Sequence, residues 1–410
     1  GLFLSPKKAD MIDEIFAKCP DVEHIWILQE DEYEAMEKVS TVMDLKKAGQ
    51  AATEDSDNPD SEDLAMIIFT SGTTGKSKGV MLTQNNLATN VDSVDYEAEP
   101  GSPSLTVLPI HHAYCLVMDW LKGFSIGATV AVNDSLLHLV RNMSIFKPQI
   151  MLMVPMMIET IYKRLVSADP SIPKLVLGEK IFGGNLKYIF TGGAHLDPFY
   201  IEKFQEYGVE ILEGYGMSEC SPVICSNTVK NHKAGSVGKP LCNVEVKIVN
   251  DEIVARGSSV MKGYLEMPEE TAETLKDGWL HTGDKGYIDE DGYVFVNGRV
   301  KNLIILSNGE NISPEEIENK LALGPLVGEV VVTGGDNGLT ARIYPDQDVV
   351  AFKGLDADSV KAGLQAFLDE YNKNQPTYRQ IVGLVIRENP FIRNATRKIL
   401  RQYALVDEKQ

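Results

Sequence analysis

Residues 64–79 read LAMIIFTSGTTGKSKG, an apolar run followed by a segment made only of Thr, Ser, Gly and Lys. The apolar part, Leu64 to Phe69, is typical of a buried strand. Glycines let backbone N–H groups approach a ligand closely, hydroxyls add short-range donors, and lysines neutralise negative charge. A flexible surface loop is the alternative, but such a loop rarely gathers these residue types so densely. The stretch from Thr70 to Gly79 therefore predicts a binding loop for a polyphosphate.

The spacing of the glycines excludes the P-loop of nucleotide kinases. That loop needs four residues between its first glycine and the Gly-Lys pair. Here only two residues separate Gly72 from Gly75. Motifs elsewhere in the sequence are needed to decide which reaction of a phosphate compound the loop takes part in.

Length and charge limit the classes to which the chain can belong. With 410 residues it is expected to form two or more domains. A formal net charge of −20, from 59 acidic and 39 basic side chains, argues against nucleic acid and anionic membranes as partners. No apolar segment is long enough to span a bilayer, and the chain opens at Gly1 without a recognisable signal peptide. We therefore expect small-molecule partners, with a local basic pocket for ATP still allowed by the total charge.

The five cysteines are scattered along the chain. Only Cys220 and Cys225 have a spacing that could suit a metal, and no His-Cys cluster supports a zinc site. Reduced thiols in the cytoplasm are the simplest interpretation. The five residues are Cys19, Cys115, Cys220, Cys225 and Cys242.

Strand-like and helix-like runs alternate over the first three hundred residues, which predicts an α/β layered fold. The short apolar runs expected to be strands include 25–28, 66–69, 105–108, 129–132 and 188–190. Helices are expected over 8–18 and 157–166. The acidic segment 51–63 is interpreted as a solvated loop. The Met-rich run 150–158 is interpreted as core, with the wall of an adaptable apolar pocket as the alternative. From Val244 onward β-patterned runs dominate, and the last hundred residues alternate strand and helix again.

A second glycine-rich motif, EGYGMSE, occupies residues 213–219 after a strand-like run. Gly214 and Gly216 permit a tight backbone path, and Tyr215 offers a flat face for a purine. Glu219 offers a hard oxygen ligand, and Mg²⁺ on a phosphate needs only one or two carboxylates. A simple strand-to-helix turn explains the motif about equally well when it is taken alone.

These motifs and three others resemble, in order along the chain, those of the adenylate-forming superfamily, which includes acyl-CoA synthetases and luciferases. Residues 70–79 resemble its phosphate loop, and 213–219 its adenine-and-magnesium motif. Residues 191–194 (TGGA) resemble the segment that packs against adenine, and 278–284 (GWLHTGD) resemble the ribose motif. Residues 396–401 (TRKILR) resemble the C-terminal motif that carries the catalytic lysine. The resemblance covers essentially the whole chain after the opening sixty residues.

The resemblance implies a catalytic set and a nucleotide-binding set. In the first, Lys398 bridges the substrate carboxylate and the α-phosphate, Thr70 belongs to the phosphate loop, and Glu219 binds Mg²⁺. Asp284 and Arg299 fix the ribose. The catalytic residues implied are Lys398, Thr70, His112 and Glu219. Those implied to bind ATP are Ser71, Gly72, Thr73, Thr74, Gly75, Lys76, Lys78, Gly193, Ala194, Gly214, Tyr215, Gly216, Ser218, Asp284 and Arg299.

Two segments resemble long-chain fatty acyl-CoA synthetases in particular. In LPIHHAY (108–114), His112 matches the histidine beside the acyl carboxylate, although a lone histidine is more often a satisfied core residue. The other segment is SNGENISPEEIE (307–318). It also predicts a helix start of its own, with Ser313 as N-cap, Pro314 in the first turn and Glu316 completing a capping box.

The chain departs from the family's pattern in two places. Arg397 stands where members usually carry glycine before the catalytic lysine, so it could constrain the loop or add a phosphate contact. Members also have a long stretch before the point where this chain begins, so the sequence is read as a fragment, a truncated form or a naturally short member. We expect weak or no turnover from the 410 residues alone, because sheet edges and core faces would be left uncovered.

The resemblance implies a large α/β domain over residues 1–300, incomplete at its start and with a β-rich subdomain, and a small mobile α+β domain over 301–410. Lys301 matches the hinge between them. The implied reaction is ATP-dependent activation of a carboxylic acid, expected to be a fatty acid, to acyl-AMP and then transfer to CoA. Two alternatives stay open: transfer to the phosphopantetheine of an acyl carrier protein, and a non-catalytic relative that binds nucleotide without turnover.

Overall fold

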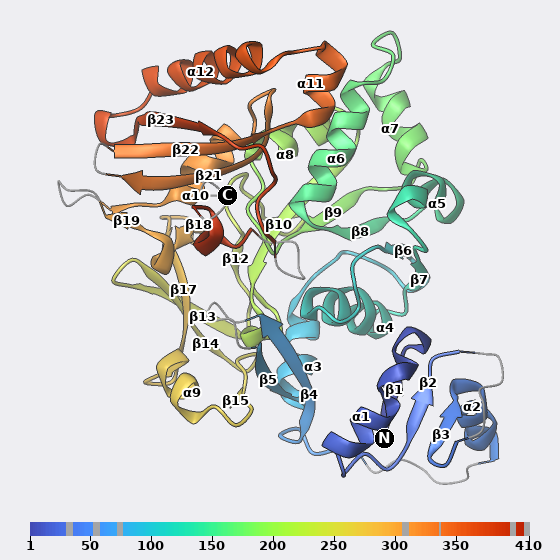
Figure 1. The fold of residues 1–410 in the computed structure, drawn as a ribbon. Coiled ribbons are helices and arrows are strands. Elements are labelled where there is room, and N and C mark those ends of the chain that lie inside the picture. The colour runs from blue at the N-terminus through green and yellow to red at the C-terminus, as the bar shows by residue number, and fades with distance from the viewer. Residues whose placement is uncertain are drawn as a thin grey trace. The chain divides into compact units, whose positions relative to one another are not determined.

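The computed structural model describes residues 1–29, 36–51, 58–71, 77–305, 311–335, 338–393 and 399–405. The chain divides into two compact units, Gly1–Pro59 and Asp60–Gln410. Figure 1 shows the secondary structure of both units.

The first unit is a small parallel sheet with helices. Its strands, in sheet order, are β1 (Leu2–Leu4), β2 (Ile25–Ile27) and β3 (Val39–Thr41). The chain between β1 and β2 begins as a 3-10 helix, η1 (Pro6–Met11), and continues as α1 (Ile12–Lys18), while α2 (Val42–Ala51) follows β3. The buried residues Ile12, Ile25, Ile27 and Val39 form its core. The strand and the helical run predicted here are confirmed.

A seven-stranded sheet is the centre of the second unit. In sheet order it contains β12 (Lys239–Pro240), β11 (Val223–Ser226), β10 (Glu210–Gly216), β9 (Tyr188–Thr191), β8 (Ile150–Met153), β6 (Pro103–Thr106) and β7 (Thr129–Val132). The strands from β10 to β7 run parallel, and β11 and β12 are antiparallel. The sheet is accompanied by α3 (Gln84–Ser93), η2 (Tyr114–Leu121), α4 (Lys122–Ser125), η3 (Leu136–His138), α5 (Leu139–Phe146), α6 (Pro155–Val166), α7 (Lys174–Phe182), α8 (Pro198–Gln205) and η4 (Ser218–Cys220).

Both faces of this sheet are buried, which explains its continuous apolar strands. In β8, Ile150 and Leu152 belong to one hydrophobic core, whereas Met151 and Met153 belong to a second one. The methionines are fully buried. The Met-rich run is therefore core within β8, as predicted, whereas Met156 in the first turn of α6 is 44% exposed. The predicted α/β layering is confirmed.

A β-rich part follows the large sheet. A five-stranded sheet contains β13 (Val244–Val249), β14 (Glu252–Gly257), β16 (Leu275–Lys276), β17 (Trp279–Ile288) and β18 (Val294–Arg299). A three-stranded sheet joins β15 (Gly263–Tyr264) to the hairpin of β4 (Leu64–Ser71) and β5 (Ser77–Thr83). The helix α9 (Pro268–Thr274) follows β15. Of the candidate site residues, these two sheets carry Thr70, Ser71, Lys78, Asp284 and Arg299.

The last hundred residues form a smaller layer of helices and strands. Its sheet has the order β21 (Val327–Gly335), β22 (Gly338–Pro345), β23 (Ile381–Ile386), and β19 (Ile304–Ile305) pairs with β20 (Asn311–Ile312). The helices are α10 (Pro314–Leu321), α11 (Gln347–Lys353), α12 (Ala357–Lys373), η6 (Thr377–Arg379) and η7 (Arg401–Tyr403). A core of buried residues, among them Ile317, Leu364 and Ile343, joins the helices to the sheet.

The predicted start of α10 is confirmed at Ser313 and Pro314, but the predicted capping box is wrong. The Ser313 hydroxyl donates to the carbonyl of Asn297 instead of accepting from the first turn. Glu316 pairs with Arg379. Both side chains that a capping box would use therefore bind residues that are distant in the sequence.

Candidate functional site

The predicted phosphate loop lies at the end of an antiparallel hairpin. Thr70 pairs with Lys78 and Ser71 with Ser77, so the ends of the loop are held in the strands β4 and β5. The predicted residues Gly72, Thr73, Thr74, Gly75 and Lys76, together with the Ser71 side chain, lie outside the described residues. The flanks of the predicted loop, residues 70–71 and 77–79, are therefore strand.

The structure brings Lys78 and Glu219 together through Tyr264. Tyr264 pairs with Val80 of β5, and its hydroxyl donates to Glu219 Oε1 at 2.8 Å. Lys78 Nζ lies 4.6 Å from the centroid of the same ring. Burial, reinforced by the Glu219 carboxylate, raises the pKa of Tyr264, so the phenol stays protonated and remains a donor. Sequence reasoning missed Tyr264, because nothing marks it 45 residues downstream of its partner.

Glu219 sits in the short turn η4 beside Ser218 and is only 8% exposed. No group of three or more His, Cys, Asp or Glu side chains suited to a metal is found among the described residues. A single carboxylate is nevertheless enough for Mg²⁺ that is shared with substrate phosphates and water. The donor set thus fits a substrate-borne Mg²⁺ and offers no all-protein metal cage in the described part of the chain.

Tyr215, Asp284 and Arg299 meet in a second cluster. Asp284 on β17 is the register partner of Arg299 on β18, and Arg299 Nε lies 2.7 Å from Asp284 Oδ1. The Tyr215 hydroxyl, from β10, donates to Asp284 Oδ2 at 2.6 Å. Burial, together with the Asp284 charge, raises the pKa of Tyr215 well above its usual value. Three residues that are far apart in the sequence and were predicted for one site are therefore in contact.

The segment predicted to pack against adenine lies at the end of β9, next to β10. Gly193 and Ala194 are exposed, and Gly193 has a φ of +80°. A Cβ placed on Gly192 would lie 3.1 Å from the carbonyl oxygen of Gly214, so the two glycine-rich motifs run side by side. Gly216 cannot be replaced without movement, because a Cβ there would lie 1.9 Å from the Pro222 oxygen.

Two buried polar atoms in this region have no hydrogen-bond partner among the described residues, Thr191 Oγ1 and Glu213 Oε2. Thr191 and Glu213 are register partners on the parallel strands β9 and β10. Burial raises the pKa of Glu213 to about 8, with Asp197 adding to the shift. A protonated Glu213 could donate as well as accept a hydrogen bond. Sequence reasoning quoted this residue but assigned it no role.

His112 lies in the turn that leads into the π-helix η2, and π-helical turns often occur at functional sites. Its carbonyl accepts from Leu116 N at 2.9 Å, and its ring lies 4.2 Å from that of His111, centroid to centroid. His112 is half-buried. Lys398, with the neighbouring Arg397, lies outside the described residues.

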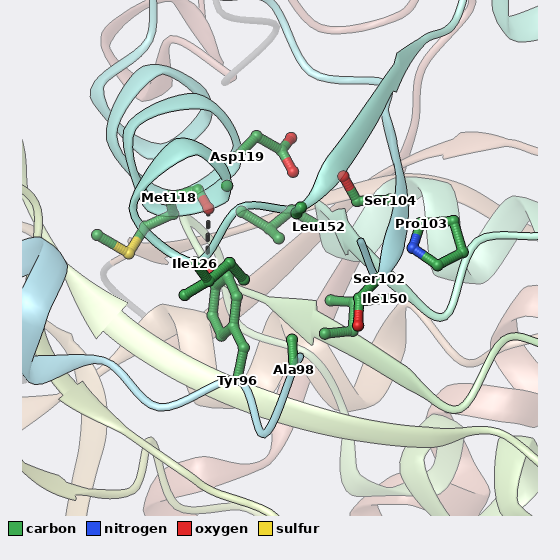
Figure 2. A pocket seen from close by; sticks show the side chains of 12 residues that line it. Tyr96, Ala98, Ser102, Pro103, Ser104, Met118, Asp119, Ile126, Ile150 and Leu152 are labelled. Atoms are coloured by element: carbon green, nitrogen blue, oxygen red, sulfur yellow. Dashed lines mark hydrogen bonds between the residues drawn. The ribbon is translucent and has the colours of Figure 1, made fainter. Parts of the chain in front are cut away.

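A small cavity of about 20 Å³ lies beside η2, between that helix and the strands β6 and β8. Figure 2 shows the side chains that line it, among them Tyr96, Ser104 and Asp119. Ser104 Oγ is buried without a hydrogen-bond partner among the described residues. Burial raises the pKa of Asp119 to about 7, although Thr106 and Cys115 donate to it. The space suits one water molecule that these polar atoms could bind.

Comparison with known proteins gives the family. The AMP-binding enzyme family matches residues 2–265, and the AMP-binding enzyme C-terminal domain matches residues 301–407. The chain therefore belongs to the AMP-binding enzyme family. It is 30% identical over 317 residues to a long-chain-fatty-acid–CoA ligase, FadD15, of Mycobacterium bovis, a match that covers 67% of this chain and 53% of the relative. The chain thus spans about half the length of that curated relative.

Solved structures support the same fold. The anthranilate CoA ligase AuaEII, in complex with anthranoyl-AMP, matches with a TM-score of 0.82 at 20% identity, covering 100% of this chain and 79% of that one. The o-succinylbenzoate CoA synthetase MenE of Bacillus subtilis, in complex with ATP and magnesium, matches with a TM-score of 0.71 at 25% identity. That match covers 98% of this chain and 83% of MenE. No helix within the described residues is both long and apolar enough to cross a membrane.

Proposed function

We propose that this chain activates a fatty acid with ATP, forming acyl-AMP, and then transfers the acyl group to CoA. Family membership and the similarity to a long-chain-fatty-acid–CoA ligase support the proposal. The observation that carries it is the contact of Tyr215, Asp284 and Arg299. Tyr215 lies in β10, and Glu219 lies in η4, the short turn that follows β10 in the chain. A bound ATP would use the Asp284 carboxylate for its ribose hydroxyls, Arg299 as a cation near its phosphates, and Glu219 as a ligand of its Mg²⁺.

The nucleotide-binding roles follow from this arrangement. The Asp284 carboxylate accepts hydrogen bonds from the ribose hydroxyls, while Arg299 and Tyr215 hold that carboxylate in place. Thr70 and Lys78, with the rest of the 70–79 loop, bind the β- and γ-phosphates. Gly193, Ala194 and Gly214 border the base, where Thr191 and Glu213 supply two buried polar atoms that lack partners among the described residues. Glu219 holds Mg²⁺, which neutralises phosphate charge when bound.

The proposed chemistry has two steps. A carboxylate oxygen of the acid attacks the α-phosphorus of ATP, and the bond to the β-phosphate oxygen breaks, so that pyrophosphate leaves with its electron pair. The CoA thiolate sulfur then attacks the acyl carbon, and AMP leaves. Both steps depend on positioning and on stabilisation of charge. Lys398 supplies a point charge between the carboxylate and the α-phosphate in the first step, and His112 borders the acyl carboxylate.

We further propose that the chain works as two domains, 1–300 and 301–410, with Lys301 as the hinge. The family matches end at residue 265 and resume at residue 301, which supports a boundary in this region. Rotation of the small domain would bring Lys398 to the α-phosphate for adenylation and remove it for thioester formation. A cytoplasmic location belongs to the same proposal, because all five cysteines are free thiols.

Pyrophosphate release tests the proposal directly. The chain is incubated with ATP, Mg²⁺ and a panel of fatty acids of different length, with CoA or with a phosphopantetheinylated acyl carrier protein as the thiol. Pyrophosphate that depends on a fatty acid, together with acyl-CoA as product, supports the proposal. If the acyl carrier protein is acylated in preference to CoA, the acceptor in the second step is the carrier protein and not CoA. ATP binding without any fatty-acid-dependent release would favour a non-catalytic relative.

A further inference from the structure

We propose that Glu252 is a positioning residue, which holds the segment that presents Asp284 by binding both His281 and Gly283. This inference rests on the proposed ribose-binding role of Asp284. Glu252 is the first residue of β14, and its carboxylate faces the 281–284 segment of β17. Neither Glu252 nor His281 was singled out by the sequence motifs as a site residue.

The strand ladder is interrupted where Asp284 lies. Glu252 pairs with Lys285 and Val254 with His281, so three residues of β17 stand opposite a single residue of β14. Such a bulge redirects side chains and leaves backbone groups without their ladder partners. Gly283 lies in the bulge with a φ of +70°, and a Cβ there would meet nothing within 4 Å. The position therefore requires glycine for its backbone conformation and not for space.

Glu252 supplies the hydrogen bonds that the interrupted ladder lacks. Its Oε1 accepts from the backbone N–H of Gly283 at 2.8 Å, and its Oε2 lies 2.7 Å from Nδ1 of His281. Both side chains are mostly buried, with 21% of Glu252 and 24% of His281 exposed. A bidentate carboxylate in such a position fixes two successive parts of the turn with one rigid group.

The residue between them is fixed to the same strand. The Thr282 hydroxyl donates to the Ile253 carbonyl at 2.7 Å and accepts from the Asp284 backbone N–H at 3.1 Å. His281 and Gly283 are thus held by Glu252, Thr282 by the neighbouring Ile253, and the Asp284 backbone by Thr282. Since Asp284 must meet Tyr215 and Arg299 within hydrogen-bond distance, a small shift of this turn would misplace its carboxylate.

The test measures how well the enzyme recognises ribose hydroxyls. Wild-type protein and the variants Glu252→Ala and Glu252→Gln are compared for KM and kcat with ATP and with 2′,3′-dideoxy-ATP. The control is Glu245→Ala, which removes an exposed carboxylate on β13 that pairs only across the surface with Arg256. The ratio of kcat/KM for the two nucleotides is internal to each preparation, so it does not depend on the fraction of protein that is folded.

We expect wild type to prefer ATP by about tenfold or more, which corresponds to the loss of one or two hydrogen bonds to a charged group. Glu252→Ala should reduce this preference to within about threefold and raise the KM for ATP more than it lowers kcat. Glu252→Gln keeps an acceptor for Gly283 N–H and should retain an intermediate preference, and Glu245→Ala should match wild type.

A wild-type preference that both Glu252 variants retain would overturn the positioning role while leaving the proposed function intact. A wild type that turns over ATP and the dideoxy analogue equally well would overturn the ribose role of Asp284, and the role of Glu252 with it. An equal loss of preference in Glu245→Ala would also overturn the inference, since the effect would then belong to the sheet as a whole.

Discussion

Replacing Asp284 by Asn should weaken ATP binding and also lower the free energy of unfolding. Asp284 accepts one partly buried hydrogen bond from Tyr215 and one from Arg299, whose side chain is 46% exposed. Hydrogen bonds to a charged group contribute about 1.5–3 kcal/mol, and neutral ones about 1 kcal/mol. The exposed Arg299 bond is partly screened and contributes less. The free energy of unfolding should therefore fall by about 1.5–2 kcal/mol.

The effect on ATP follows from the same loss of charge. If the carboxylate also accepts from the ribose hydroxyls, Asp284→Asn should cost about 2 kcal/mol of binding, or roughly a 30-fold weaker Kd for ATP. Urea unfolding measures the first quantity, and calorimetric titration with ATP and Mg²⁺ measures the second. Asp291→Asn is the matched control, because Asp291 forms an exposed ion pair with Lys233. Loss of stability with an unchanged Kd for ATP would contradict a role in ribose binding, since Asp284 would then be purely structural.

The remaining predictions concern the phosphates, the small domain and pH. Glu219→Gln should slow acyl-AMP formation, and raised Mg²⁺ should partly restore the rate in a pyrophosphate assay; an unchanged rate would remove Glu219 from the metal site. Lys398→Ala should slow acyl-AMP formation about 100-fold or more, yet keep most of the thioester activity with preformed acyl-AMP, and equal loss in both steps would contradict domain rotation. The raised pKa of Glu213, from 4.5 to about 8, means that its contribution to stability is lost as pH rises through about 8. In Glu213→Gln the free energy of unfolding, measured with urea between pH 5 and 8.5, should fall less with pH than in wild type. An unaltered pH dependence would show that another group titrates.

The fold class could be predicted from the sequence because the alternation of apolar runs directly reflects buried parallel strands. Boundaries could not be predicted as well. The strand expected at 105–108 occupies Pro103–Thr106, where pairing of Pro103 with Thr129 sets the register. Both ends of the loop expected from Thr70 to Gly79 are strand, because β4 pairs with β5 as far as Ser71 and Ser77. In both places the decisive contacts come from another strand, which local pattern does not reveal.

The candidate site divides in the same way. Tyr215 and Asp284 belong to motifs whose residue types indicate nucleotide binding, and Arg299 is implied by the resemblance to the family. The structure places these three residues in contact. Tyr264 and Glu252 belong to no such motif. Each is defined by a long-range partner, Glu219 in one case and the bulge at Gly283 in the other. Supporting residues of this kind become visible only once the sheets bring distant segments together.

The most direct test of the central claim, that this chain forms acyl-AMP, is exchange of radiolabelled pyrophosphate into ATP. The exchange runs through the reverse of the first step, so it detects slow adenylation and needs neither CoA nor a carrier protein. We predict label in ATP only when Mg²⁺ and a fatty acid are both present, together with acyl-AMP detected by mass spectrometry. Binding of ATP with no exchange for any fatty acid in the panel would contradict the claim.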